Sequence, residues 1–404
     1  MHEAIESENQ SLAGQSGAAS PLAGIVVLDL GVHRAGPHCA LILARLGADV
    51  IKVEAVSGQE GRTHGPMWAQ ENNSKRSLAL DIKSPQGQRV LRALARRVDV
   101  LVQNFRPGVM KSLNLDIAEL MAANERLIVA SVSAYGSGSV YRERPGFDGM
   151  MQAEAGLMML NGTSDMPPLK TRPAIVDRVA GLHASIGVLA ALHERARTGR
   201  GQHVDVALCQ SAYSLVDAEM AGAMTTGEEP ARLGNRAAGP PVNQAFQASD
   251  GWLYLCTGGR QRMWESICTM IGREDWLSDP RFTTKEARSR NAAIIEAEMQ
   301  RFFIGRTVSE AIDTCVAHRV PAAPVRTVLE AAASDYVKER RVITQVGSPD
   351  GEVPVFDDPW HFSRSSVKVF DVPAVGQHTR DVMRRLGGFT DAEVEALIGE
   401  GVIG

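Results

Sequence analysis

The feature that most constrains the fold of this 404-residue chain is a strand–helix–strand pattern that begins near residue 25. Residues 25–30 (IVVLDL) form an almost continuous apolar and β-branched run, which is typical of a strand buried on both faces. A loop at 31–37, a helical segment at 38–46 and a second strand at 50–54 follow. Strands joined by a helix in this way run parallel, so the pattern predicts an α/β fold with a parallel sheet.

The alternation of helices and strands continues along the chain. Ser84 and Pro85 are expected to open a helix, because serine caps helices and proline suits their first turn. A glycine- and proline-rich connector near residues 232–242 precedes a second α/β unit. A helix is expected after Asp177, with Val179, Leu182, Ile186 and Leu189 on its apolar face. Further strands are predicted at 98–102, 127–132, 203–208 and 252–255, and further helices at 263–271, 292–303, 309–317 and 392–398.

These elements predict a large doubly wound, Rossmann-like α/β domain together with a smaller α/β domain. The first residues are polar and include several glutamates, so a disordered N-terminal tail is expected there. The predicted bounds are 1–20 for the tail, 21–225 for the large domain, 226–240 for a linker, 241–325 for the small domain and 326–404 for a linker and C-terminal return to the large domain.

Composition argues against several classes of function. The formal net charge of −4, without a long Lys/Arg run, makes nucleic acid and anionic membranes poor partners. No apolar run reaches the ~18 residues of a transmembrane helix, and the N-terminus lacks the apolar core of a signal peptide. The 5 cysteines include no C-x-x-C pair, which predicts a reducing, cytoplasmic location without disulfides or a zinc site.

The first loop invites, and then disfavours, a dinucleotide-binding function. Glu54 ends the second strand, where an acid that binds a ribose hydroxyl would stand. However, the loop reads GVHRAGP rather than G-x-G-x-x-G, and Arg34 and Pro37 occupy positions where the backbone would approach a pyrophosphate. No G-x-S-x-G motif is present, so a serine hydrolase is also disfavoured.

Two other groups of residues have a structural and a functional interpretation. His33, His38 and Cys39 fit no common zinc spacing, so we interpret them as a loop histidine and the start of a packed helix. The basic residues before the Ser84 helix are interpreted as a solvated surface patch, with a phosphate clamp as the alternative, and comprise Lys75, Arg76 and Lys83.

Asp177 is the candidate residue with the clearest chemistry. Aspartate is a favoured N-cap, and an apolar helix follows directly, so a structural role alone would explain it. The same position also suits catalysis, because a helix N-terminus keeps a carboxylate ionised and its free N–H groups can hold a developing oxyanion. Both interpretations are compatible with the spacing.

Taken in order, the motifs resemble those of the class III CoA-transferase family (CaiB/BaiF type, formyl-CoA transferase-like). The similarity spans residue 21 to the C-terminus, and the order and spacing of the motifs are more specific than any one of them. The resembling segments are 21–30, 34–37, 46–54, 73–81, 102–108, 144–148, 152–153, Asp177 with Gly181, 198–206 and 376–379.

The resemblance implies a role for each matching residue. Asp177 would attack a donor acyl-CoA thioester, giving a mixed anhydride and then an aspartyl-CoA intermediate. The implied CoA-binding residues are Arg34, Ala35, Leu80, Lys83, Asn104, Phe105 and Arg106, and the implied substrate-binding residues are Phe147 and Asp148.

The chain departs from the family pattern at Ala55, at Ser112 and at Arg34. The first two replace basic residues expected in CoA contacts, although Lys111 stands next to Ser112. Arg34 places a cation near the acyl end, which suits the second carboxylate of a dicarboxylic substrate; a salt-bridged loop residue is the alternative.

The resemblance further implies an interlocked, ring-like homodimer with an acyl-CoA donor and a carboxylate acceptor as substrates and no permanently bound cofactor or metal. An α-methylacyl-CoA racemase shares the fold, but it needs two acid/base groups, and Phe147 stands where that subgroup has a histidine. A non-catalytic acyl-CoA-binding subunit of a two-chain transferase is a third alternative, which the presence of Asp177 disfavours.

Overall fold

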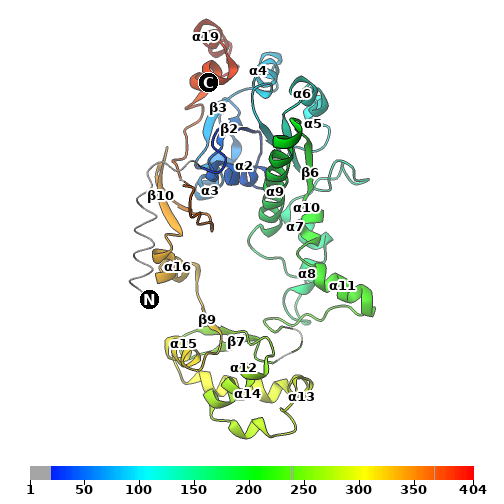
Figure 1. Cartoon of the computed structure of the whole chain (residues 1–404), viewed down its shortest axis with the longest axis vertical. Helices are drawn as coiled ribbons and strands as arrows, with labels where there is room; N and C mark the ends of the chain where they lie inside the picture. The colour runs from blue at the N-terminus through cyan, green and yellow to red at the C-terminus, as the bar shows by residue number, and fades with distance from the viewer. Residues whose placement is uncertain (1–19, 238, 240, 368) are drawn as a thin grey trace. The chain divides into compact units, whose positions relative to one another are not determined.

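The structure is a computed structural model that describes residues 20–237, 239, 241–367 and 369–404. All but the last residue of the predicted disordered tail therefore lie outside the described residues. The described chain forms two compact units (Figure 1), the first comprising residues up to Leu157, Thr171–Met220 and Arg340–Gly404. The second unit comprises Met158–Lys170 and Ala221–Glu339. It thus includes a segment from within the predicted large domain and extends beyond residue 325.

The first unit is built on a six-stranded sheet in which every neighbouring pair of strands is parallel. The α/β prediction is therefore confirmed. The strand order is β3-β2-β1-β4-β5-β6, so the direction of winding reverses between β1 and β4. In open sheets of this kind, ligands bind at the carboxyl ends of the strands beside that reversal. The strands are β1 (Val26–Asp29), β2 (Asp49–Glu54), β3 (Arg76–Ala79), β4 (Val100–Gln103), β5 (Ile128–Ser133) and β6 (His203–Ala207).

Helices cover both faces of this sheet, because successive strand residues point to opposite sides. Val27 contributes to a core with α2 (Ala35–Arg45), α9 (Ile175–Thr198) and α10 (Leu208–Tyr213). Leu28, the next residue, contributes to a second core on the other face. The helices of that second core are α4 (Pro85–Ala95), α5 (Val109–Ser112), α6 (Ile117–Ala123), η3 (Val382–Gly387) and α19 (Asp391–Gly399).

The second unit has an antiparallel sheet of β7 (Gln244–Gln247), β8 (Trp252–Leu255) and β9 (Ala322–Val325). Its core includes the aromatic residues Trp276, Phe282 and Phe303. Its helices include α12 (Gln261–Ile271), η2 (Glu274–Leu277), α13 (Lys285–Arg290), α14 (Ala292–Ile304) and α15 (Val308–Ala317).

The remaining elements of the described residues, from both units, are η1 (Glu60–His64), α3 (Pro66–Asn72), α7 (Asp148–Glu154), α8 (Leu157–Leu160), α11 (Asp217–Thr226), α16 (Val328–Ala332), α17 (Asp335–Glu339), β10 (Ile343–Ser348), β11 (Gly351–Phe356) and α18 (Thr379–Asp381).

The predicted apolar face of α9 is wrong. Leu182 is 40% exposed and Ile186 is 62% exposed, although both were expected to be buried. The helix instead buries small residues because it packs closely against α2: a Cβ at Gly181 would lie 2.9 Å from the Ala35 carbonyl oxygen. The residues that it buries are Val176, Ala180, Gly181, Ala184, Ser185, Val188, Ala191 and Arg195.

Helix α9 is also, among the described residues, the one element long and apolar enough to cross a membrane by length and composition, with a mean hydropathy of 1.5. That indication is weak, because the core helices of globular proteins meet the same criteria. Its packing against α2, β5 and the neighbouring core explains the apolar composition.

A buried ionic cluster supports the loop between β1 and α2. Asp29 lies at the end of β1, fully buried, and its carboxylate accepts a hydrogen bond from Lys75 Nζ at 2.8 Å, with Lys52 Nζ at 3.7 Å. The same two ammonium groups donate to the carbonyl oxygens of Pro37 and Gly31. Burial alone would raise the pKa of Asp29, but the two lysines lower it below its usual value. Both interpretations of Lys75, as a surface residue and as a phosphate clamp, are therefore wrong, since its charge is used inside the protein.

We expect Asp29→Asn to lower the free energy of unfolding by about 3–5 kcal/mol at pH 7, because two buried ammonium groups lose their nearest counter-charge. Urea titration followed by circular dichroism would measure the change. Asp49→Asn is the matched control, since it removes an exposed ion pair with Arg76 from the same sheet and should cost about 1 kcal/mol or less. Equal losses in the free energy of unfolding of the two variants would contradict a stabilising role for the buried Asp29 contacts.

Candidate active site

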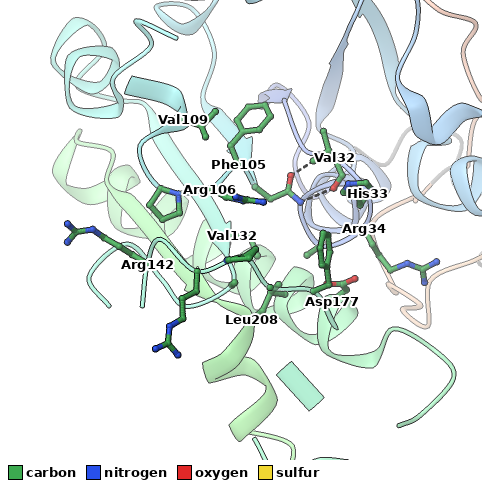
Figure 2. A pocket seen from close by; sticks show the side chains of 18 residues that line it. Val32, His33, Arg34, Phe105, Arg106, Val109, Val132, Arg142, Asp177 and Leu208 are labelled. Carbon is green, nitrogen blue, oxygen red and sulfur yellow. Dashed lines mark hydrogen bonds between the residues drawn. The ribbon is translucent and has the colours of Figure 1, made fainter. Parts of the chain in front are cut away.

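A cavity of about 440 Å³ lies at the carboxyl ends of β1, β4 and β5, beside the reversal in strand order (Figure 2). The β1–α2 loop, the loop after β4, the loop before α7 and the first turn of α9 form its walls. This is the position at which an open parallel sheet binds its ligand. The lining residues are Val32, His33, Arg34, Ala35, Asn104, Phe105, Arg106, Pro107, Val109, Val132, Ala134, Arg142, Arg144, Pro145, Gly146, Phe147, Asp177 and Leu208.

Hydrogen bonds between a side chain and the backbone fix two of the walls to each other. The Asn104 amide accepts a hydrogen bond from the Val32 N–H at 2.7 Å and donates to the Val32 carbonyl at 2.8 Å, as the dashed lines in Figure 2 show. Asn104 thus joins the loop after β4 to the loop after β1. The close approach of α2 and α9 at Gly181 brings Ala35 and Asp177 to the same cavity.

Asp148 caps the helix that carries Asp177. Its Oδ2 accepts hydrogen bonds from the Val176 N–H at 2.7 Å and the Asp177 N–H at 3.2 Å, while Gln152 donates to Oδ1 at 2.6 Å. The helix begins at Ile175, so Asp177 is not the N-cap, and the expected free N–H groups at this terminus are already bonded. Both expectations are wrong because a residue from another helix supplies the cap. Asp148 does not line the cavity itself.

Asp177 is a partly buried carboxylate without a partner. Among the described residues, its side chain forms no ion pair or hydrogen bond, and it is the one acid in the cavity lining. Burial raises its pKa to about 6, and the nearby carboxylates of Asp148 and Glu71 add to this effect, which the Arg34 guanidinium opposes. At neutral pH the group is therefore ionised, but it is more basic than an ordinary aspartate.

The cavity is otherwise strongly cationic. Arg34, Arg106, Arg142 and Arg144 all line it, which makes it suited to an anionic ligand. Sequence reasoning assigned no role to Arg142 or Arg144. Arg144 belongs to the segment that resembled the family, so its position before Pro145 was an available signal, whereas Arg142 carried none.

His33 and Phe147 face each other in the lining, with ring centroids 6.3 Å apart in an edge-to-face arrangement. His33 has a φ of 58°, a backbone conformation that residues other than glycine rarely adopt. The structure thus places His33 in the lining of the candidate site. No group of three potential metal-binding side chains occurs among the described residues.

Two predicted CoA-binding residues lie elsewhere on the same edge of the sheet. Leu80 and Lys83 follow β3, which is two strands, or about 10 Å, from β1. Leu80 is 2% exposed and bridges to Ile403, so any contact with a ligand would involve its backbone. Lys83 is exposed. A ligand that reached both Asp177 and Lys83 would be long and extended.

Three other residues singled out in the sequence serve structural contacts. Glu54 is buried, and its carboxylate accepts hydrogen bonds from Arg62 and Ser77, so it is not free to bind a ribose. His38 is hydrogen-bonded to Glu71, and Cys39 is fully buried, with a pKa that burial raises to about 12. The site therefore combines an unpaired carboxylate with arginine-lined walls, an arrangement that suits covalent chemistry on an anionic substrate.

Known proteins with similar sequences and structures share one family. A family model described as CoA-transferase family III matches residues 22–379. A succinyl-CoA–D-citramalate CoA-transferase of Chloroflexus aurantiacus is 30% identical, with 95% of this chain and 98% of the relative covered. A formyl-CoA:oxalate CoA-transferase of Rhodopseudomonas palustris is also 30% identical, with 95% and 97% covered. The crystal structure of a CAIB/BAIF family protein from Brucella suis matches with a TM-score of 0.82 at 31% identity, covering 91% of this chain and 100% of that one.

We expect Asp177→Asn to stabilise the protein at pH 7.5 by about 1–3 kcal/mol. The folded-state pKa, about 6, lies above the usual 3.8, so the ionised carboxylate opposes folding above pH 6 and this cost disappears as the pH falls towards 4. Urea titrations at pH 7.5 and pH 4 would measure both values. A gain that was the same at the two pH values would show that the raised pKa is not its cause.

Proposed function

Because this chain belongs to CoA-transferase family III, we propose that it moves CoA from an acyl-CoA thioester to a carboxylic acid, with Asp177 as the nucleophile. Its relatives are named CoA-transferases, and the chain is an enzyme of this type. The observation that carries the proposed mechanism is the isolated Asp177 carboxylate, which stands without a partner in a cavity lined by four arginines. The raised pKa supports it, because a more basic carboxylate is a better nucleophile.

The proposed reaction exchanges acyl groups without net proton transfer. An Asp177 carboxylate oxygen attacks the thioester carbonyl carbon, the C–S bond breaks, and a mixed anhydride and CoA thiolate result. The thiolate then attacks the aspartyl carbonyl carbon, which releases the donor acid and leaves an aspartyl-CoA thioester. The acceptor carboxylate attacks the carbonyl carbon of this thioester, the C–S bond breaks, and a second mixed anhydride and CoA thiolate result. The thiolate attacks the acceptor's carbonyl carbon, which gives the new acyl-CoA and releases the Asp177 carboxylate.

In the proposed complex, CoA lies along the carboxyl edge of the sheet, from Asp177 across β1 and β2 to the end of β3. Arg34, Ala35, Phe105 and Arg106 line the cavity and would contact the thioester and pantetheine, with Phe105 also suited to stacking on a base. Lys83 is exposed at the far end, where a phosphate would bind. Arg142 and Arg144 supply further positive charge near the acyl group.

The proposed acids are dicarboxylic. The two relatives are named for succinyl-CoA with D-citramalate and for formyl-CoA with oxalate, and three of these four acids have two carboxyl groups. While one carboxylate reacts at Asp177, the second needs a cation close by. Arg34 suits this role, because its guanidinium lies close enough to Asp177 to affect the pKa of that carboxyl, and Arg34 lines the same cavity.

The proposal also includes a cytoplasmic homodimer. All five cysteines are free, as expected in a reducing compartment. Helix α9 exposes Leu182 and Ile186, which are large apolar residues of the kind that a second subunit would cover.

We expect Asp177→Ala to abolish CoA transfer, because neither covalent intermediate can form without the carboxylate. Incubating the enzyme with succinyl-CoA and succinate carrying a heavy isotope, and detecting labelled succinyl-CoA by mass spectrometry, would measure exchange. Asp217→Ala, which removes an exposed acid at the start of α11, should leave exchange intact.

Near-normal exchange by Asp177→Ala would refute the mechanism. In the wild-type enzyme, hydroxylamine should trap an adduct at Asp177 during turnover. Deuterium uptake at the α carbon of a chiral 2-methylacyl-CoA, without CoA transfer, would instead favour the racemase.

We expect Arg34→Gln to raise the KM for succinate by roughly ten-fold or more, because one charge-assisted pair contributes about 1.5–3 kcal/mol. The KM for butyrate, which has the same length and no second carboxylate, should change much less. Acceptor KM values measured with one CoA donor would give both numbers. A similar change for both acids would show that Arg34 does not read the second carboxylate.

A further inference from the structure

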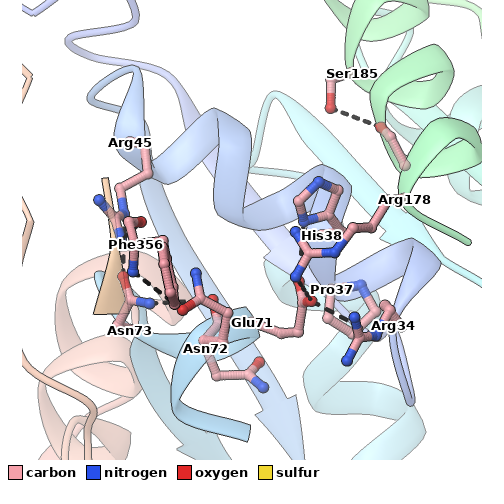
Figure 3. Close-up of polar contacts among 12 residues, drawn as sticks. Arg34, Pro37, His38, Arg45, Glu71, Asn72, Asn73, Arg178, Ser185 and Phe356 are labelled. Carbon is pink, nitrogen blue, oxygen red and sulfur yellow. Dashed lines mark hydrogen bonds and ion pairs between the residues drawn. The ribbon is translucent and has the colours of Figure 1, made fainter. Parts of the chain in front are cut away.

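A second carboxylate, Glu71, raises the pKa of Asp177 through its charge. Figure 3 shows the basic groups that surround Glu71. Glu71 belongs to α3, and its side chain is 1% exposed. Its Oε2 lies 3.0 Å from His38 Nδ1, and its Oε1 lies 3.4 Å from Arg178 Nη2 and 3.8 Å from Arg34 Nε. Three basic side chains from α9 and the start of α2 therefore converge on one buried acid.

Arg34 acts on both acids. It lowers the pKa of Glu71 and opposes the rise in the pKa of Asp177, so its charge acts on both carboxyl groups. Its ion pair, however, is with Glu71. Glu71 is more deeply buried than Asp177, and attraction between charges is stronger where less water screens it.

His38 and Arg178 strengthen this preference. His38 occupies one oxygen of Glu71 and so orients the other oxygen towards the arginines. Arg178 is the residue after Asp177 on α9, and its guanidinium is likewise directed to Glu71. Asp177 is next to Arg178 in the sequence and near Arg34 in space. Within the described part of the chain it nevertheless forms no ion pair.

We propose that Glu71 is a positioning residue that holds the Arg34 guanidinium away from Asp177, so that the carboxylate stays unpaired and free to attack the thioester. The inference rests on the proposed function of Asp177. Without Glu71, the planar guanidinium of Arg34 would pair with Asp177, and such pairs are short, bidentate and strong. An aspartate paired in this way is a weak nucleophile, because its lone pairs are already engaged and its basicity falls.

The same arrangement leaves Arg34 available for a substrate carboxylate. The pair with Glu71 is 3.8 Å long and is not a hydrogen bond, so Glu71 does not take up the hydrogen-bond donors of Arg34, a residue of the cavity lining. Glu71 thus separates two tasks that one arginine next to one nucleophile could not otherwise perform together, namely binding an anionic substrate and leaving the nucleophile free.

The pH dependence of transfer tests this proposal. The charged groups that act on Asp177 are Arg34, Asp148 and Glu71, and those that act on Glu71 are His38, Arg34 and Arg178; His38 in turn faces Asp358. The attacking carboxylate must be ionised, so activity should be lost as the pH falls through about 6, the pKa of Asp177. Loss of the Glu71 charge would by itself lower the pKa of Asp177, because Glu71 raises it, so the part of the shift that depends on Arg34 is what tests the positioning role.

We expect Glu71→Gln to move the acid limb of kcat/KM downwards by about one pH unit or more, because Arg34 is then free to pair with Asp177. The rate at pH 7.5 should fall by roughly ten-fold as the nucleophile becomes less basic. The double variant Glu71→Gln/Arg34→Gln should return the limb to near its wild-type position, since the competing cation is gone. This reversal is the decisive measurement.

Asp357→Asn is the matched control. It removes the partner of Arg45, a buried arginine at the other end of α2, and should lower thermal stability without moving the acid limb. If Glu71→Gln does not fold, Glu71→Asp keeps the charge but retracts the carboxylate by one methylene group, and it should give a smaller shift in the same direction.

An unchanged acid limb in the folded Glu71 variant, or a double variant that shows no reversal, would overturn the proposal. Failure of the proposed function is a separate result, because it would appear as exchange activity in Asp177→Ala. The two ideas therefore fail on different variants in the same assay.

Discussion

The buried contact between Asp29 and the two lysines Lys52 and Lys75 is the interaction on which the rest of the site depends. It binds the end of β1 to β2 and to the start of β3, and the same lysines hold the backbone of the loop that follows β1. That loop carries one wall of the cavity and begins α2. Helix α2 in turn determines where α9 can pack, because the two helices approach most closely at Gly181. A series of contacts that begins at the buried Asp29 and its two lysines thus fixes the position of Asp177.

The active site that results is governed by how charge is distributed rather than by a large number of polar groups. One carboxylate faces the cavity without a partner, while two others, Asp148 and Glu71, are fully engaged. Asp148 satisfies the helix terminus, and Glu71 satisfies the nearby cations. Each would be an ordinary structural contact on its own. Both carboxylates raise the pKa of Asp177, which Arg34 opposes, while four arginines line the cavity that Asp177 faces.

Much of the fold could be predicted from the sequence, because local patterns determine it. The strand runs near residues 25–30 and 127–132 are apolar and β-branched, and Ser84 caps α4 as its sequence predicts. The buried face of α9 could not be predicted in this way, since alanine and glycine carry little hydrophobic signal and only the neighbouring helix makes them the packing face. Lys75 was missed for a related reason: its partner, Asp29, is 46 residues away along the chain. Asp177 and Arg34 were found through local motifs, whereas Arg142 and Glu71 enter the site only through tertiary structure.

The cap that Asp148 provides has an evolutionary consequence. Phe147 lines the cavity, and the next residue ties α7 to the helix that carries Asp177, so a cavity residue and a framework residue lie side by side in the sequence. A substitution of Asp148 would disturb the reaction with every acid substrate alike. New specificities would therefore arise most readily at lining positions such as His33, Arg34 and Phe147, which can vary while the reaction centre is inherited unchanged.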